Sequence, residues 1–175
     1  MYKKDQCQRY ERKNCTKEII NVFKNDKKIL LCGNGGSAAD AQHLAAELSG
    51  RFYIDRPPLF AEALHVNTSY LTAVANDYSF DEVYARLVKA KGRPSDILIG
   101  ISTSGNSSNI IKAIYAAKEV GMISVGFTGK TGGKMVSLCD YLINIPSQDA
   151  ARIQEAHILI GHIICEIVER KLFPA

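Results

Sequence analysis

The sequence lacks paired cysteines at short spacing and any long hydrophobic run. Its five cysteines are odd in number and form no Cys-x-x-Cys pair, which argues against a disulfide framework or a zinc ribbon and indicates a reducing compartment. No apolar stretch approaches the ~20 residues of a membrane helix, and the polar start lacks the apolar core of a signal peptide. We therefore expect a cytoplasmic protein with no membrane partner.

The sequence also lacks a strong charge imbalance. Its 175 residues carry a net charge of +4, and 46% of them are hydrophobic, which is an ordinary globular balance for one domain over residues 1–175. Acidic residues interrupt even the densest basic stretch, residues 2–13. This stretch favours a solvated helix face over a nucleic-acid-binding arm, so we expect no nucleic-acid partner.

Short β-rich apolar runs alternate with helical patterns along the chain. We expect strands at 28–32, 60–66, 96–101, 122–127 and 140–145. Helices are expected at 37–48, 80–90, 106–120 and about 150–171, with residues 1–27 forming an N-terminal helical segment. The strands are near-continuously apolar, as in sheets covered on both faces. The pattern predicts an α/β fold in which helices sandwich a parallel sheet.

The first strand-to-helix junction, residues 32–40, matches the dinucleotide fingerprint G-x-G-x-x-A. That fingerprint also needs an acid at the end of the next strand, whereas Asp55 precedes that strand, so we discount NAD. The alternative is a tight turn that requires glycines, with Asn34 and Ser37 adding polar groups and a helix cap.

The second junction, residues 100–109, is rich in hydroxyl groups. It holds Ser102, Thr103, Ser104, Ser107 and Ser108, but no G-x-x-x-x-G-K-[ST] pattern of nucleotide P-loops. Hydroxyls and backbone N–H groups at a helix N-terminus suit a phosphate monoester. The alternative is a serine-rich loop with an ordinary helix cap. We favour the phosphate site.

Two helical segments carry side chains that could share a metal. His43 and Glu47 are four residues apart, which places them on one helix face. Gln154 and His162 are eight apart, on nearly the same side of the last helix. Two histidines and a carboxylate suit zinc, with an amide oxygen as an unusual fourth ligand. The alternative is a buried polar pair and a structural histidine.

Four blocks together resemble the phosphoheptose isomerase (sedoheptulose 7-phosphate isomerase) family of SIS-domain proteins. They are CGNGGSAADAQHLAAEL, NDYSFDEVYAR, GISTSGNSSNIIKAI and RIQEAHILIGH, within a likeness running from about residue 19 onward. The resemblance implies a five-stranded parallel sheet in a homotetramer with sites at subunit contacts. It also implies conversion of sedoheptulose 7-phosphate to D-glycero-D-manno-heptose 7-phosphate. That step opens the route to nucleotide-activated heptose, which lipopolysaccharide, capsule and glycoprotein pathways share.

The resemblance assigns roles to individual residues. It implies substrate binding by Asn34, Gly35, Gly36, Asn76, Asp77, Ser102, Thr103, Ser104, Ser107 and Gln154. It implies one zinc ion per subunit on His43, Glu47, Gln154 and His162, with Glu47 and His162 as the acid–base pair. Moving a carbonyl between C1 and C2 requires such a base and a group that steadies the enediolate. Because zinc lowers the basicity of a bound carboxylate, the ion acts either as a Lewis acid or as a structural element.

The sequence departs from the family pattern in two places. The segment before the first strand is shorter than usual, which bears on tetramer contacts. Ala151 stands where some members have an acid, and Asp149 is the nearby candidate to replace it.

Two other readings of the SIS resemblance compete with the enzyme. One is a non-catalytic phosphosugar-binding protein similar to the DnaA initiator-associating protein, whose group lacks the acid–base pair that Glu47 and His162 retain here. The other is a sugar-phosphate sensor domain, for which too few residues precede the sheet to form a helix-turn-helix.

Overall fold

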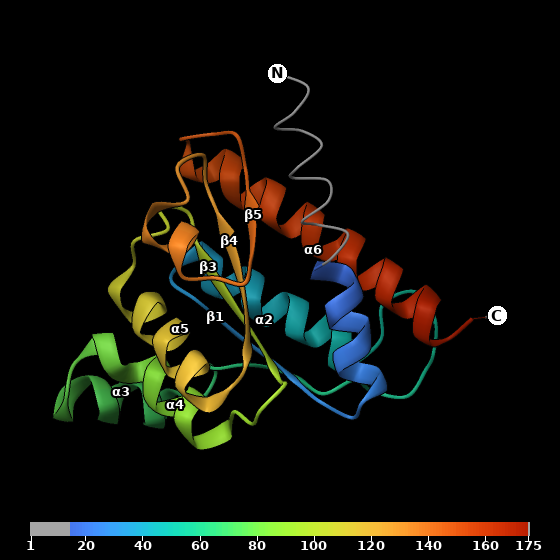
Figure 1. Ribbon diagram of the computed structural model, residues 1–175, viewed down its shortest axis with the longest axis horizontal. Helices are drawn as coiled ribbons and strands as arrows, with labels where there is room; N and C mark the ends of the chain where they lie inside the picture. Colours follow the sequence, from blue (N-terminus) through green and yellow to red (C-terminus); the bar gives the residue numbers. More distant parts are fainter. Residues whose placement is uncertain (1–14, 175) are drawn as a thin grey trace.

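A five-stranded parallel sheet forms the centre of the computed structural model, which describes residues 15–174 (Figure 1). Its strand order is β2-β1-β3-β4-β5, and every neighbouring pair is parallel. The strands are β1 (Ile29–Gly33), β2 (Ala61–Ala63), β3 (Ile97–Ser102), β4 (Ile123–Thr128) and β5 (Tyr141–Asn144). The predicted α/β fold with a parallel sheet is confirmed.

Helices cover both faces of the sheet. On one face lie a helix over residues 15–24, α2 (Gly36–Ser49) and the long α6 (Ala150–Leu172), red in Figure 1. On the other lie α3 (Thr68–Asp77), α4 (Val83–Lys91) and α5 (Ser108–Val120), with the 3₁₀ turns η1 (Phe80–Glu82) and η2 (Gly133–Ser137). Of the predicted N-terminal helical segment 1–27, residues 1–14 lie outside the described residues.

The strands supply both hydrophobic cores by alternation. In β1, Ile29 and Leu31 join the core under α2 and α6, whereas Leu30 and Cys32 join the core under α4 and α5. Successive strand side chains point to opposite faces, so a strand covered on both sides must be apolar throughout. This is why the strand runs were recognisable in the sequence.

The structure corrects the boundaries of the second strand and adds a helix after it. The run predicted as a strand at 60–66 pairs with β1 only over Ala61–Ala63. α3 was not predicted, because its sequence TSYLTAVAND mixes polar and β-branched residues with little apolar periodicity. Asn67 starts this helix by accepting a hydrogen bond from the Tyr70 backbone N–H at 3.0 Å.

The sequence analysis expected neither a disulfide framework nor a membrane-spanning helix, and both expectations concern features of the described residues. Cys15, Cys32, Cys139 and Cys165 all carry free thiols, and Cys7 lies outside the described residues. Over residues 15–174, no helix combines the length and apolar character needed to cross a bilayer.

The sheet changes its winding direction at β1, which fixes where a ligand can bind. The chain passes from β1 to β2 on one side and later returns to β3 on the other side of β1. In open α/β sheets, ligands bind beyond the carboxyl ends of the strands at such a point. The loops after β1 and β3 are the two junctions singled out in the sequence.

Candidate active site

The loop after β3 gathers three serine hydroxyls into one cluster. Ser102, at the end of β3, is 3% exposed, and its Oγ lies 3.0 Å from Ser107 Oγ and 3.4 Å from Ser104 Oγ. Ser107 is the N-cap residue of α5, yet its hydroxyl does not cap the helix. The cluster therefore presents hydroxyl groups beside the positive end of a helix dipole, which is a suitable environment for a phosphate.

The loop after β1 is joined to this cluster by a pair of amides. Asn34 Nδ2 donates to Asn109 Oδ1, and Asn109 Nδ2 donates to Asn34 Oδ1, both at 2.9 Å. Asn109 lies in the first turn of α5, is 2% exposed, and its Oδ1 also accepts from the Ile110 N–H. The two loops are thus tied together across the switch point.

Asn109 was missed in the sequence, although a signal existed. It is an amide at a position of α5 that packs inward with Ile110, and a buried amide requires partners. The structure also shows that the Asn34 side chain is engaged within the protein. What the loop offers outward is its exposed glycines, Gly35 and Gly36.

One sequence expectation at this loop is wrong. Ser37 was expected to cap the helix after β1, but the N-cap residue of α2 is Gly35 and no side chain caps it. Ser37 is 3% exposed and its backbone N–H donates to the Asn34 carbonyl at 3.0 Å. The turn is tight enough to place Ser37 inside the first helical turn.

α2 and α6 run side by side in the same direction. Gly36 and Gly161 allow the close approach, since a Cβ at Gly36 would lie 2.6 Å from Gln154 Oε1 and one at Gly161 would lie 2.5 Å from Leu44 Cδ2. The start of α2 therefore lies beside Gln154. A later turn of α2, at Leu44, lies beside Gly161, the residue before His162. Side chains far apart in sequence meet along this seam.

Three of the predicted metal ligands converge there. His43 Nε2 lies 2.9 Å from His162 Nε2 and 3.3 Å from Glu47 Oε1. The ligand atoms of these three residues all lie within 4.8 Å of one another. His43 is exposed and the other two are partly buried, so the group is open to a ligand from solution.

The donor set fits a zinc ion. Two imidazole nitrogens and a carboxylate oxygen are ligands that zinc prefers, and three protein ligands leave a position for substrate. Two ring nitrogens at 2.9 Å also need either a proton or a cation between them. A ring proton joins the two nitrogens as a hydrogen bond, and a cation bound to both nitrogens would take its place.

Gln154 lies apart from this group. It leaves α6 two turns before His162, about 12 Å along the axis, and its amide rests against Gly36. Its location suits contact with a ligand at the β1 loop.

His157, one turn after Gln154 on α6, is fully buried, and its Nε2 lies 3.2 Å from the Thr128 carbonyl. Burial lowers the pKa of His157, which keeps the ring neutral.

The remaining predicted residues lie around the serine cluster or on the surface. The Thr103 carbonyl accepts a hydrogen bond from the Gly129 N–H at 2.9 Å, which links the loops after β3 and β4. Asn76 and Asp77 are exposed at the end of α3, and the Asn76 amide donates to the Asp77 carboxylate at 3.0 Å. Asp81, in η1, accepts a hydrogen bond from the Ser108 hydroxyl, so this segment borders the start of α5.

Asp149 caps the N-terminus of α6. It is the N-cap residue of α6, and its Oδ1 accepts from the Ala151 backbone N–H at 2.9 Å. A carboxylate at this position also complements the helix dipole. Its cap fixes the start of the helix that carries Gln154 and His162.

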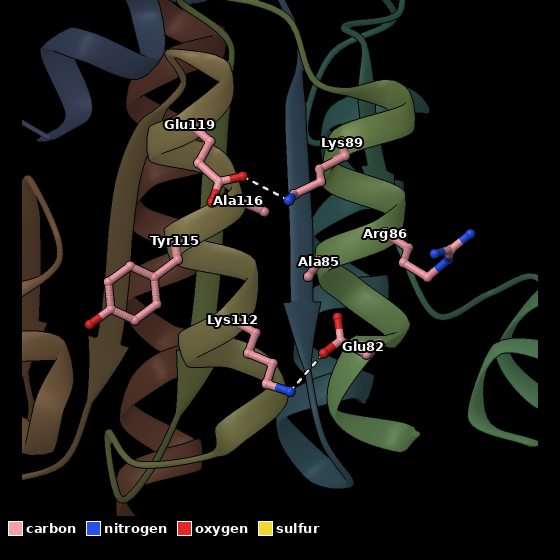
Figure 2. Close-up of a pocket in the computed structure, with 8 residues that line it drawn as sticks. All are labelled: Glu82, Ala85, Arg86, Lys89, Lys112, Tyr115, Ala116 and Glu119. Atoms are coloured by element: carbon pink, nitrogen blue, oxygen red, sulfur yellow. Dashed lines mark hydrogen bonds and ion pairs between the residues drawn. The ribbon is translucent and has the colours of Figure 1, made fainter. Parts of the chain in front are cut away.

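The opposite face of the sheet offers a contrast. A groove of about 280 Å³ lies between α4 and α5 and contains none of the predicted site residues. Two exposed ion pairs bridge its walls, Lys89–Glu119 and Lys112–Glu82, both at 2.7 Å (Figure 2). These four charges are paired with one another, and the remaining charged residue, Arg86, lies over the Tyr78 ring, 4.2 Å from its centroid. The groove therefore shows ordinary surface interactions.

Comparison with known proteins identifies the relatives of this chain. Residues 11–129 match the SIS domain family. The sequence is 59% identical over 156 residues to the phosphoheptose isomerase of Aneurinibacillus thermoaerophilus, spanning 89% of this chain and 79% of that relative. It is 56% identical to phosphoheptose isomerase 2 of Campylobacter jejuni, spanning 92% of this chain and 80% of the relative.

A solved structure agrees with the sequence relatives. The phosphoheptose isomerase of Neisseria gonorrhoeae superposes with a TM-score of 0.86 at 47% identity, covering 91% of this chain and 85% of the other. The chain belongs to the phosphoheptose isomerase family of SIS-domain proteins.

Proposed function

We propose that this protein is an isomerase that converts sedoheptulose 7-phosphate to D-glycero-D-manno-heptose 7-phosphate. The observation that carries the proposal is the convergence of His43, Glu47 and His162 within 4.8 Å from helices more than 100 residues apart in the chain. The names of the family relatives support the same activity. Isomerisation here is the first step in making nucleotide-activated heptose.

The arrangement provides two groups for proton transfer. A ketose becomes an aldose when a base removes a proton from C1, giving an enediolate, and a proton is then returned to C2. Glu47 supplies the base, and His162 is the acid that moves a proton to and from the oxygens. His43 bridges the two, since its Nε2 is within 3.3 Å of both side chains.

The same group would hold one zinc ion through His43, Glu47 and His162. For the Gln154 amide to be the fourth ligand, as the family resemblance implies, its side chain would have to turn from Gly36 toward His162. Bound zinc would supply Lewis acidity toward a substrate oxygen. The nitrogen-to-nitrogen approach of His43 and His162 supports this assignment.

The serine loop is proposed to bind the phosphate. Ser102, Ser104 and Ser107 supply hydroxyl donors, and the N-terminus of α5 supplies backbone N–H groups. Thr103, Gln154 and the glycines after β1 would contact the sugar between its two ends. Asn76 and Asp77, from the segment that borders α5 through Asp81, complete the proposed substrate set.

A homo-oligomer, with a tetramer as the expected form, is proposed from the exposed surface of α6. Leu159, Ile163 and Ile167 are 60, 46 and 39% exposed and follow each other at helical spacing. Exposed Tyr53 and Ile54 lie in the segment that packs on the end of α6. Because Leu159 and Ile163 flank His162 in the sequence, a second copy on this surface would also cover the acid–base pair.

The contact between Glu47 and His162 through His43 favours an enzyme over a non-catalytic phosphosugar-binding protein, which needs no acid–base pair. The free thiols at four cysteines support a reducing, cytoplasmic location. No nucleic-acid or membrane partner is proposed.

Incubation with sedoheptulose 7-phosphate, monitored by proton NMR, tests the function. We expect the anomeric signals of an aldose heptose phosphate to appear with catalytic amounts of protein. Sedoheptulose without phosphate is the matched control and should react poorly, because the serine loop then has no anion to bind. A protein that binds the phosphorylated ketose without producing any aldose would support the binding-protein reading instead.

A further inference from the structure

A buried ion pair lies directly behind the acid–base group. The side chains of Arg56 and Glu169 are 2 and 3% exposed, and Arg56 Nε lies 3.4 Å from Glu169 Oε2. Arg56 comes from the segment after α2, and Glu169 comes from the last turns of α6. Neither residue was singled out in the sequence.

Arg56 binds the end of the helix that carries Glu47. Its Nη2 donates to the Glu47 carbonyl at 2.8 Å, and its Nη1 donates to the carbonyls of Leu48 at 2.7 Å and Gly50 at 3.2 Å. Glu47 and Leu48 lie in the last turn of α2, where carbonyls lack partners within the helix, and Gly50 is the C-cap residue that follows. A cation here also complements the negative end of the helix dipole.

Glu169 binds the segment immediately after α2. Its carboxylate accepts hydrogen bonds from the backbone N–H groups of Phe52 at 3.2 Å, Tyr53 at 2.9 Å and Ile54 at 3.3 Å. The Phe52 ring then packs beside the His162 ring, with centroids 5.7 Å apart. Through these contacts, Glu169 fixes a wall of the site next to His162.

Burying two charges is costly, and an apolar pair of similar volume would serve stability as well or better. Seven hydrogen bonds from one buried pair to the backbone instead fix the end of α2 and residues 52–57 against the end of α6. The end of α2 carries Glu47, and Phe52 packs beside His162. The buried pair therefore serves to position the backbone around Glu47 and His162 rather than to stabilise the fold.

We propose that Arg56 and Glu169 form a positioning pair that fixes Glu47 relative to His162 for proton transfer. The proposal rests on the isomerase function given above. Arg56 holds the Glu47 backbone and Glu169 holds the Phe52 wall against His162, so loss of the pair displaces one catalytic side chain from the other. The serine loop contacts neither residue, and phosphate binding should be unaffected.

The test compares three variants with a matched control. Glu169→Gln keeps an acceptor oxygen and removes the charge, whereas Arg56→Lys keeps the charge and removes the fork. Arg56→Met combined with Glu169→Leu replaces the pair by apolar side chains, which guards against failure to fold. Lys89→Met combined with Glu119→Leu removes an exposed ion pair on the other face and serves as the control.

We expect kcat to fall ~10–100-fold in Glu169→Gln and in the apolar double variant, because displacing catalytic groups by about 1 Å costs this much. KM should stay within about threefold, so the loss should fall on kcat. A change that only destabilised the fold would instead lower the melting temperature and leave kcat per folded molecule unchanged. Arg56→Lys should keep a larger share of the wild-type kcat than the apolar double variant does, because it retains the positive charge. The control should keep the wild-type kcat.

A crystal structure of the apolar double variant keeps the proposal testable even if the wild type has no isomerase activity. Displacement of Glu47 from His162 supports it, whereas unchanged placement overturns it in either case. A folded double variant with wild-type kcat also overturns it, and so does a lower melting temperature without a kinetic change. An inactive wild type would refute the proposed function alone.

Discussion

The two faces of the sheet use charged side chains in different ways. Between α4 and α5, Lys89–Glu119 and Lys112–Glu82 are exposed pairs in which each charge has a partner (Figure 2). Between α2 and α6, two histidines meet one carboxylate, and the nearby Arg56–Glu169 pair is buried. The α2/α6 side gathers groups that can move protons and supports them with a buried ion pair, and this is where chemistry is expected.

Energetics reinforces this contrast. Exposed ion pairs contribute ~0–1 kcal/mol because water and salt screen them, so the α4/α5 face can change its charges at little cost. On the α2/α6 face, removal of one side chain among His43, Glu47 and His162 leaves the other two without a hydrogen-bond partner, or leaves a bound cation short of a ligand. Substitutions on the two faces should therefore differ widely in effect, with the largest losses at the acid–base group.

Glu47→Gln and His162→Gln should each lower kcat by ~10²–10⁴-fold, because each removes a positioned acid or base. Both variants should still bind sedoheptulose 7-phosphate by calorimetry, since the serine loop is unchanged. Zinc content must be measured in parallel, because loss of the ion would imitate loss of the base. Normal turnover by both variants with metal content intact would show that the acid–base assignment is wrong.

Replacing Ser102, Ser104 and Ser107 by alanine should weaken substrate binding. Each hydrogen bond to the charged phosphate contributes ~1.5–3 kcal/mol, so even one substitution should raise KM by ~10-fold or more. Ser137→Ala, which removes an exposed hydroxyl that donates to the Lys134 carbonyl, is the control. An unchanged KM in the triple variant would refute the phosphate assignment.

Asn109→Ala should destabilise the fold by ~1–3 kcal/mol, because it leaves the Asn34 amide without its buried partner. The double variant with Asn34→Ala should cost much less than the sum of the two single changes, as expected for residues in direct contact. Urea unfolding of the four proteins measures this coupling. Additive free energies of unfolding would show that the amide pair does not join the two loops.

Removing the exposed Lys89–Glu119 pair should have the smallest effect. The double change Lys89→Met with Glu119→Leu is expected to alter the free energy of unfolding by less than ~1 kcal/mol. Isomerase activity should remain at the wild-type level. A large loss of activity would mean that the α4/α5 face takes part in function and would remove the contrast between the faces.

Features that depend on neighbouring residues could be predicted from the sequence. The serine loop is contiguous, and His43 and Glu47 are one helical turn apart, so both were recognisable. The strands were visible because both of their faces are buried. The family resemblance supplied the match between His43 and His162, which are 119 residues apart.

Features that depend on distant partners were missed. Asn109 pairs with a residue 75 positions away, and Glu169 binds Phe52 across 117 positions. A buried amide or carboxylate has no periodic pattern that names its partner, so only the folded chain shows it. Ser37 was misjudged for a different, local reason, since the glycine turn after β1 lets α2 begin at Gly36 and places Ser37 inside its first turn.

Proton exchange at C1 tests the central claim most directly. In D₂O, wild-type protein should incorporate deuterium into sedoheptulose 7-phosphate at C1 and into the aldose product at C2, both detected by NMR. Glu47→Gln should bind the ketose and leave its C1 protons unexchanged. The account is contradicted if Glu47→Gln exchanges the C1 protons at the wild-type rate, because another group would then be the base.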